Sequence, residues 1–183
     1  LGDVYKRQAQ AAITAESFDT PAKMGNLLIF APEGTGCTYE GNVVINGMAE
    51  KISLTHGKGF RSPQAFKAKD ITYKRNFSMK SGNKINAAGW EAIVLPFDVQ
   101  SFSNEKQGEL APFNSGKKGV KPFWLAQMTT DGFEHTTAMK ANKPYIISLP
   151  NSESYEDEFN ISGEVQFHAE DAGGVKVKAT SYK

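Results

Sequence analysis

The sequence is poor in the residues that mark several large classes of protein. Its one cysteine, Cys37, permits no internal disulfide and no cysteine-based metal site. Its three histidines, His56, His135 and His168, are scattered without a catalytic or metal-ligand spacing. No Gly-x-Ser-x-Gly motif and no phosphate-binding Gly-Lys-Ser/Thr motif is present. We therefore expect a non-enzymatic chain with no catalytic residues, no metal site and no cofactor.

An excess of charge of one sign is missing too, as are long apolar runs. Lys and Arg total 21 against 20 Asp and Glu, which gives a formal net charge of +1 and no basic footprint for nucleic acid. The longest purely apolar run covers 27–31. That is far short of the roughly 20 residues that span a bilayer. The sequence predicts no nucleic-acid partner and no transmembrane segment in this fragment.

Helical periodicity is also scarce, and strand-like alternation takes its place. The best helical candidate, 8–17, has no apolar stripe beyond alanines. In 71–77, apolar residues share one parity, which Arg75 interrupts. The run 91–99 is apolar on both faces, which favours a central strand, although Pro96 favours an edge or a strand end. Further strand candidates are 27–31, 43–46, 52–54, 123–128, 145–149, 159–161, 165–168 and 175–179.

The spacing of these strands and turns predicts the fold class. Turn residues at 162–164 and 170–174 indicate hairpins, and 103–121 is typical of a solvated loop. Twelve Phe, six Tyr and two Trp can fill a core. Short strands with frequent turns favour an all-β fold, an antiparallel β-sandwich of jelly-roll-like or Ig-like type with little helix.

The chain divides into four expected segments. Residues 1–8 resemble the conceptual translation of a transposase end sequence used in sequencing libraries. We therefore expect that they are an adapter artefact and that the native N-terminus is missing. A signal peptide could then not be observed in this sequence. Residues 9–25 are predicted to be irregular or a linker. Residues 26–58 are predicted as a short β segment, the tail of a preceding repeat or domain. Residues 59–183 are predicted as the main β-sandwich module, truncated at its C-terminus.

Three motifs carry a family resemblance. They are Tyr73-Lys-Arg75, then Gly89-Trp-Glu-Ala-Ile-Val-Leu-Pro-Phe-Asp-Val99, then Ala141-Asn-Lys-Pro-Tyr-Ile-Ile147. Together they resemble a β-rich module of secreted and cell-surface proteins of gut and oral Bacteroidota, with the pattern Tyr-x-Arg, Trp-x-x-x-x-Leu-Pro-Phe and Ala-x-x-Pro-Tyr-Ile. The resemblance covers roughly 26–180. Relatives often carry Cys or Thr just before Leu-Pro-Phe, where this chain has Ala, Ile and Val at 92–94.

The resemblance implies a compartment more than a chemistry. Such proteins are typically large and exported, and are expected to work in surface attachment or assembly. It therefore implies an extracellular or cell-surface location, with neighbouring domains of the same polypeptide, an extracellular polysaccharide, or a host or bacterial surface protein as partner.

Aromatic residues near turns are the candidate binding site. Trp90, Trp124 and Tyr155 could form a platform that stacks sugar rings, as exposed aromatics do on many carbohydrate-binding modules. The alternative is that they fill the core of the sandwich. Glu91, beside Trp90, is the one acid placed as a sugar-cleft acid could be, and the acidic stretch 153–158 is interpreted as a solvated loop.

Two functions from different classes remain open. The leading interpretation is a non-enzymatic, exported, cell-surface module with a structural or adhesive role, a fragment of a larger protein. The alternative is a carbohydrate-binding module attached to a polysaccharide-utilisation enzyme or capture system. A hydrolase would need paired acids in a cleft at a separation that sequence does not show.

Overall fold

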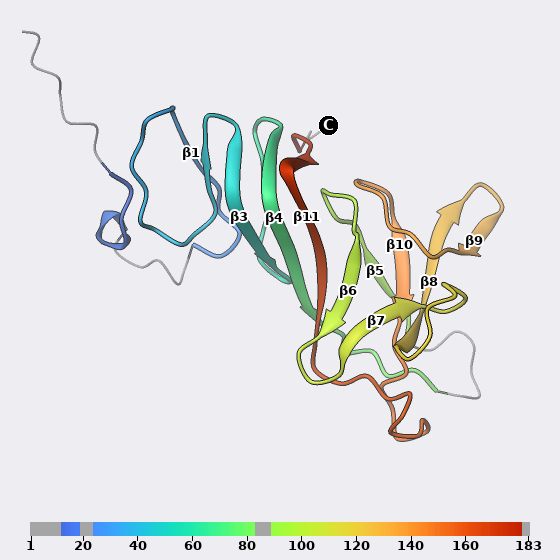
Figure 1. Ribbon diagram of the computed structural model, residues 1–183. Coiled ribbons are helices and arrows are strands. Elements are labelled where there is room, and N and C mark those ends of the chain that lie inside the picture. Colours follow the sequence, from blue (N-terminus) through green and yellow to red (C-terminus); the bar gives the residue numbers. More distant parts are fainter. Residues whose placement is uncertain (1–11, 19–23, 83–88, 181–183) are drawn as a thin grey trace, which may run out of the picture.

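The computed structural model describes residues 12–18, 24–82 and 89–180, and these are mostly β structure (Figure 1). The one helical segment among them is a 3-10 turn, η1 (Ala15–Ser17), inside the weak helical candidate. The strands are β1 (Ile29–Ala31), β2 (Val43–Ile45), β3 (Met48–Thr55), β4 (Phe66–Asn76), β5 (Glu91–Ile93), β6 (Ser101–Asn104), β7 (Gly108–Pro112), β8 (Lys121–Thr129), β9 (Gly132–His135), β10 (Tyr145–Ser148) and β11 (Glu164–Val177).

The strands pair in the order β1-β2-β3-β4-β11-β6-β7-β8-β10-β5, and β9 adds to β8 beside this path. Figure 1 shows β1, β3, β4 and β11 at one end of the molecule and β8, β9 and β10 at the other. Strand β8 belongs to both parts of the sheet, because its first residues pair with β7 and its later ones with β10 and β9.

The prediction of a mostly β fold is confirmed, but its antiparallel part was wrong for three strand pairs. Strands β1–β2, β3–β4 and β7–β8 are parallel, so the sheet is mixed. The physical reason lies in the connections 32–42, 56–65 and 113–120. Each carries the chain back to the starting end of its neighbour, which a two-residue hairpin turn could not do.

The residues expected to be the tail of a preceding domain join the same sheet. Strand β3 pairs with β4 from Met48 opposite Lys67 to Thr55 opposite Lys74. Buried side chains of one core cluster run from Val44 in β2 to Val177 in β11. The segment 26–58 therefore shares a continuous sheet and a continuous apolar core with the residues that follow it.

A coordinated irregularity keeps the core on one side of this sheet. In β3 the buried positions change parity between Ala49 and Ile52, and in β4 between Ala68 and Ile71. Strand β11 shifts its register against β4 between Glu170 and Val175. A β-bulge inserts residues without ending a strand, so apolar side chains on both sides of it reach the same core.

Several predicted boundaries were wrong. The expected loop 103–121 contains the end of β6 and all of β7, and the expected strand 159–161 is a turn followed by irregular chain. The expected turn 170–174 is the bulge within β11. The run 91–99 is not a central strand. Strand β5 ends at Ile93 and pairs with β10 at the end of the strand order, because Pro96 cannot donate to a ladder.

Candidate functional site: an aromatic outer face

Four short strands, in the order β9-β8-β10-β5, place aromatic residues on one face. The register sets His135 opposite Ala126, Ala126 opposite Ile146 and Ile146 opposite Ala92. Directly opposed residues share a face, and so do residues two apart along a strand. This face therefore also carries Trp124, Met128 and Phe133. The alternate residues Ile93, Leu125 and Ile147 are buried in the core. We call the first set, with Trp90 and Tyr155, the outer aromatic face.

Two of the three predicted platform residues lie together. The ring centroids of Trp124 and Tyr155 are 6.0 Å apart, and the rings are tilted by 51°. Trp124 projects from β8, whereas Tyr155 comes from the loop that follows β10. Both side chains are half-buried, so each keeps part of its surface open to solvent. Neither is a fully buried core residue.

Trp90, the third predicted residue, pairs with a different ring. Its ring centroid lies 6.4 Å from that of His135. Trp90 directly precedes β5 at one edge of the four-strand group, and His135 comes from β9 at the opposite edge. The strands between these two residues carry small or modest side chains on this face, and Ala126 is 3% exposed. The Trp90 and His135 rings therefore contact each other on the face where His135 lies opposite the buried Ala126. His135 is a member of this face that the sequence did not indicate.

The face also carries exposed aliphatic and aromatic groups. Met128 is 59% exposed and Phe133 is 57% exposed, and the two are opposed across β8 and β9. Large apolar groups gathered on a surface mark interaction sites more often than single exposed ones do. Met128 belongs to β8 and Phe133 to β9, and β9 is exposed to solvent along its whole length.

Glu91 supports this face rather than acting as a cleft acid. Its carboxylate accepts hydrogen bonds from the Arg75 guanidinium and, at 2.8 Å, from the Met79 N–H. Arg75 also donates to the Ala92 carbonyl at 2.8 Å, and its guanidinium lies 4.6 Å from the centre of the Phe77 ring. Burial raises the pKa of Glu91, but these hydrogen bonds and the charge of Arg75 outweigh it and leave the pKa lowered. Arg75 therefore anchors β5 directly beside Trp90.

Gly89 lets the chain pass close to the backbone of Ser81 directly before Trp90. Its φ is +79°, a conformation that favours glycine. A Cβ at this position would lie 2.7 Å from the backbone of Ser81. The Ser81 hydroxyl donates to the Leu149 carbonyl, and its N–H donates to the side chain of Asn151. Both the conformation and the crowding require glycine immediately before Trp90.

The three sequence motifs meet at this place. Arg75 of the first motif binds the backbone of Ala92 in the second. The second motif forms β5, which pairs with β10 of the third through Ile93 and Tyr145. Leu95 and Phe97 of the second motif are buried in the core. The motifs are distant in the sequence, but the strands β4, β5 and β10 that carry them are joined by these contacts.

Loop 139–142 is tied to the second motif by an exposed ion pair. Asp98 accepts hydrogen bonds from Lys140 Nζ at 2.8 Å and from the Ala141 N–H at 2.7 Å. The hydrogen bond from Lys140 is the main cause that lowers the pKa of Asp98, and the same bond raises the pKa of Lys140. This contact fixes the loop that leads into β10.

A serine, a histidine and an aspartate form a row that sequence inspection missed. Ser101 Oγ lies 3.5 Å from His168 Nδ1, and His168 Nε2 lies 3.2 Å from Asp70 Oδ1. In a catalytic triad the carboxylate holds Nδ1 and the nucleophile faces Nε2, so this order is reversed. Pairing of β6, β11 and β4 creates the row, and only the register could have revealed it.

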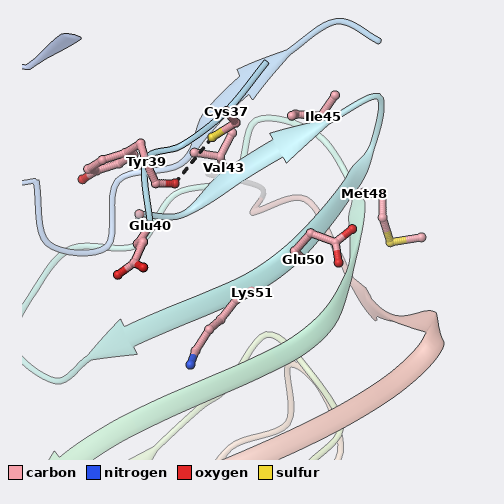
Figure 2. Close-up of a pocket in the computed structure, with 9 residues that line it drawn as sticks. Cys37, Tyr39, Glu40, Val43, Ile45, Met48, Glu50 and Lys51 are labelled. Carbon is pink, nitrogen blue, oxygen red and sulfur yellow. Dashed lines mark hydrogen bonds between the residues drawn. The ribbon is translucent and has the colours of Figure 1, made fainter. Parts of the chain in front are cut away.

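Cys37 borders an open pocket of 670 Å³ at the other end of the molecule. Figure 2 shows the pocket between the segment 37–40 and strands β2 and β3. Val43, Ile45 and Met48 supply apolar lining, and Glu40, Glu50 and Lys51 add charge. Cys37 is exposed, and its thiol donates to the Tyr39 carbonyl at 3.4 Å. Among the described residues, no histidine lines this pocket.

Two kinds of feature are absent from the described ranges. There, no three His, Cys, Asp or Glu side chains gather as a metal site would require. The same ranges contain no helix with the length and apolar character needed to cross a membrane. The acidic stretch 153–158 lies in turns at the surface.

Comparison with known proteins adds no relative to these observations. No protein-family model, curated protein or solved structure matches the chain. The site is therefore interpreted from its own geometry, in which the outer aromatic face gathers the three predicted aromatic residues.

Proposed function

We propose that this chain is a non-enzymatic module of an exported, cell-surface protein, and that it adheres to other molecules through the outer aromatic face. One observation carries the proposal: β9, β8, β10 and β5 form a group of strands with one aromatic-rich face, and the opposite face of β8, β10 and β5 packs on the core. The residues of the aromatic-rich face are Trp90, Trp124, Met128, Phe133, His135 and Tyr155. Half-buried aromatic rings on a rigid sheet offer a large contact area at low cost in side-chain entropy. In this proposal the curled mixed sheet acts as a β-sandwich-type scaffold.

The adhesive role is tested with beads that carry the purified chain. Retention is measured on surfaces coated with polysaccharide or with surface glycoprotein, for the unchanged chain and for the double variant Met128→Ser, Phe133→Ser. Both side chains are more than half exposed, so the variant removes apolar contact area with little effect on the core. We expect retention to fall several-fold. Equal retention of the variant would contradict the adhesive role of this face.

A second candidate function, carbohydrate binding, is favoured by the ring geometry. Trp124 and Tyr155 form a tilted pair with centroids 6.0 Å apart, which offers two faces to adjacent sugar rings. A glycan array tests this candidate with Trp124→Ala as the variant. Carbohydrate binding predicts signals that disappear in Trp124→Ala. If the chain binds none of many polysaccharides on the array, carbohydrate binding is contradicted, whereas the adhesive role is not.

A further inference from the structure

A small pocket opens where the curled sheet meets itself. Strand β5 ends the strand order, yet Arg75 of β4 reaches it through the carbonyl of Ala92. Just past this contact lies a pocket of 190 Å³. Its lining comes from the turn after β3, from β4 and from the chain that follows β5. The lining residues include Leu54, His56, Lys58, Phe60, Tyr73 and Val94. We call it the seam pocket.

Apolar side chains form much of its wall. Leu54 and Leu95 are 2% and 3% exposed, so they form the floor beneath the pocket, whereas Val94 is 56% exposed and offers open apolar surface. Phe60 is half-buried against the core cluster, and Pro96 is buried. An aromatic ring and aliphatic groups on fixed backbone can contact the apolar face of one small ring.

Polar groups lie at the same pocket. His56 Nδ1 is 2.9 Å from the Tyr73 hydroxyl, and the two rings meet edge to face with centroids 6.5 Å apart. Burial raises the pKa of Tyr73, so its hydroxyl stays protonated and able to donate. Tyr73 is in turn held by Phe167, whose ring centroid is 5.8 Å away.

The turn that carries His56 is held in place before any ligand arrives. Asn26 is 3% exposed and binds this turn with both ends of its amide. Its nitrogen donates to the carbonyls of Thr55 at 3.0 Å and Lys58 at 2.8 Å, and its oxygen accepts from the Thr55 N–H at 2.7 Å. A preformed turn lowers the ordering cost of binding.

The titratable lining of the seam pocket points to the charge of its ligand. Lys58 is a cationic side chain, the His56–Tyr73 pair adds a ring nitrogen and a hydroxyl group, and no aspartate or glutamate is among the lining residues. The nearby carboxylate of Glu91 is already bound by Arg75 and the Met79 N–H. A carboxylate on the ligand would meet donors and no competing acid.

We propose that the seam pocket binds a single uronate residue, a sugar ring that carries a carboxylate. The apolar wall takes one face of the ring, and the carboxylate lies toward Lys58 and the His56–Tyr73 pair. The pocket volume matches one ring rather than a chain of several. The inference does not depend on the proposed function, because none of the lining residues belongs to the outer aromatic face.

The test is an NMR titration of the isotope-labelled chain with D-glucuronate, and with D-glucose as the neutral counterpart. We expect glucuronate to bind roughly tenfold more tightly than glucose, the scale of one charge-assisted hydrogen bond. Lys58→Met should remove most of that difference. Tyr73→Phe keeps the ring against Phe167 and should weaken glucuronate binding by a smaller factor.

The matched controls separate this site from the outer aromatic face. Lys118→Met removes an exposed lysine outside the pocket and should leave the glucuronate titration unchanged. Trp124→Ala should also leave it unchanged, whatever it does to adhesion. The inference is overturned if neither sugar gives a saturable shift, if glucose binds as tightly as glucuronate, or if Lys58→Met binds glucuronate like the unchanged chain.

Discussion

Arg75 and Glu91 form the most buried ion pair among the described residues, with side chains 7% and 10% exposed. In the alternation pattern of the sequence, Arg75 interrupts an apolar strand face. Its partners come from a strand 16 residues further on, so no local pattern could show that the charge is satisfied. Glu91 is the reason that a charged side chain is tolerated here, since a buried charge requires a partner.

Removing one member of this pair should be costly. We expect Glu91→Gln to lower the free energy of unfolding by about 3 kcal/mol, because it leaves the buried guanidinium with less compensation. The measurement is denaturant unfolding followed by tryptophan fluorescence. As a control, Lys69→Met breaks the exposed pair with Glu50 and should cost less than about 1 kcal/mol. Equal effects of the two variants would contradict the structural role of Glu91.

The lowered pKa of Glu91 also predicts a pH dependence. Because this pKa lies below its unfolded value, the stability it confers is complete above about pH 4.3 and is lost as the pH falls through the folded pKa. The unchanged chain should lose stability on acidification more steeply than Glu91→Gln does. Parallel pH profiles of unfolding for the two proteins would rule this out.

At the scale of elements, the strands with buried side chains were easier to predict than the exposed or glycine-rich ones. Alternation or an apolar run revealed most of β4, β8 and β10, because side chains of each strand pack in the core. Strands β6, β7 and β9 escaped notice, since β9 is exposed along its whole length and β7 lies in a stretch rich in Gly, Lys and Ser. The bulge in β11 resembled a turn because its Asp-Ala-Gly-Gly sequence is typical of one.

The entry to β5 gives a test at this scale. Gly89 and Gly47 have similar positive φ angles, +79° and +76°, but only Gly89 faces backbone at the distance of a clash. Gly47→Ala therefore measures the backbone strain alone. We expect Gly89→Ala to destabilise the protein by about 1–3 kcal/mol more than Gly47→Ala does, in thermal or denaturant unfolding. Equal losses of stability in the two variants would contradict a requirement for close packing of residue 89 against Ser81.

At the scale of the whole molecule, the sheet joins residues that the sequence divided near residue 58. Composition and turns suggested that division, but parallel pairing between β3 and β4 links positions that local patterns do not relate. The outer aromatic face has the same origin. Trp90, Trp124 and Tyr155 could be chosen as aromatics near turns, whereas the contact with His135 depends on the pairing of β8 with β9.

A continuous core predicts cooperative unfolding across that division. Leu54 in β3 is 2% exposed, and both tryptophans lie beyond residue 58. Leu54→Ala should lower the stability reported by tryptophan fluorescence by about 2–5 kcal/mol. Circular dichroism should give the same midpoint. An unchanged fluorescence transition in Leu54→Ala would mean that 26–58 unfolds separately.

We propose the outer aromatic face as the binding surface of the module. The most direct test follows the two indole N–H resonances by NMR while the coating that best retains the beads is added in soluble form. The sequence has only two tryptophans, so Trp90→Phe and Trp124→Phe assign both signals. We predict that the Trp124 signal shifts or broadens with added partner, and that Met128→Ser, Phe133→Ser reduces this response. Binding that leaves both indole signals unchanged would contradict the claim.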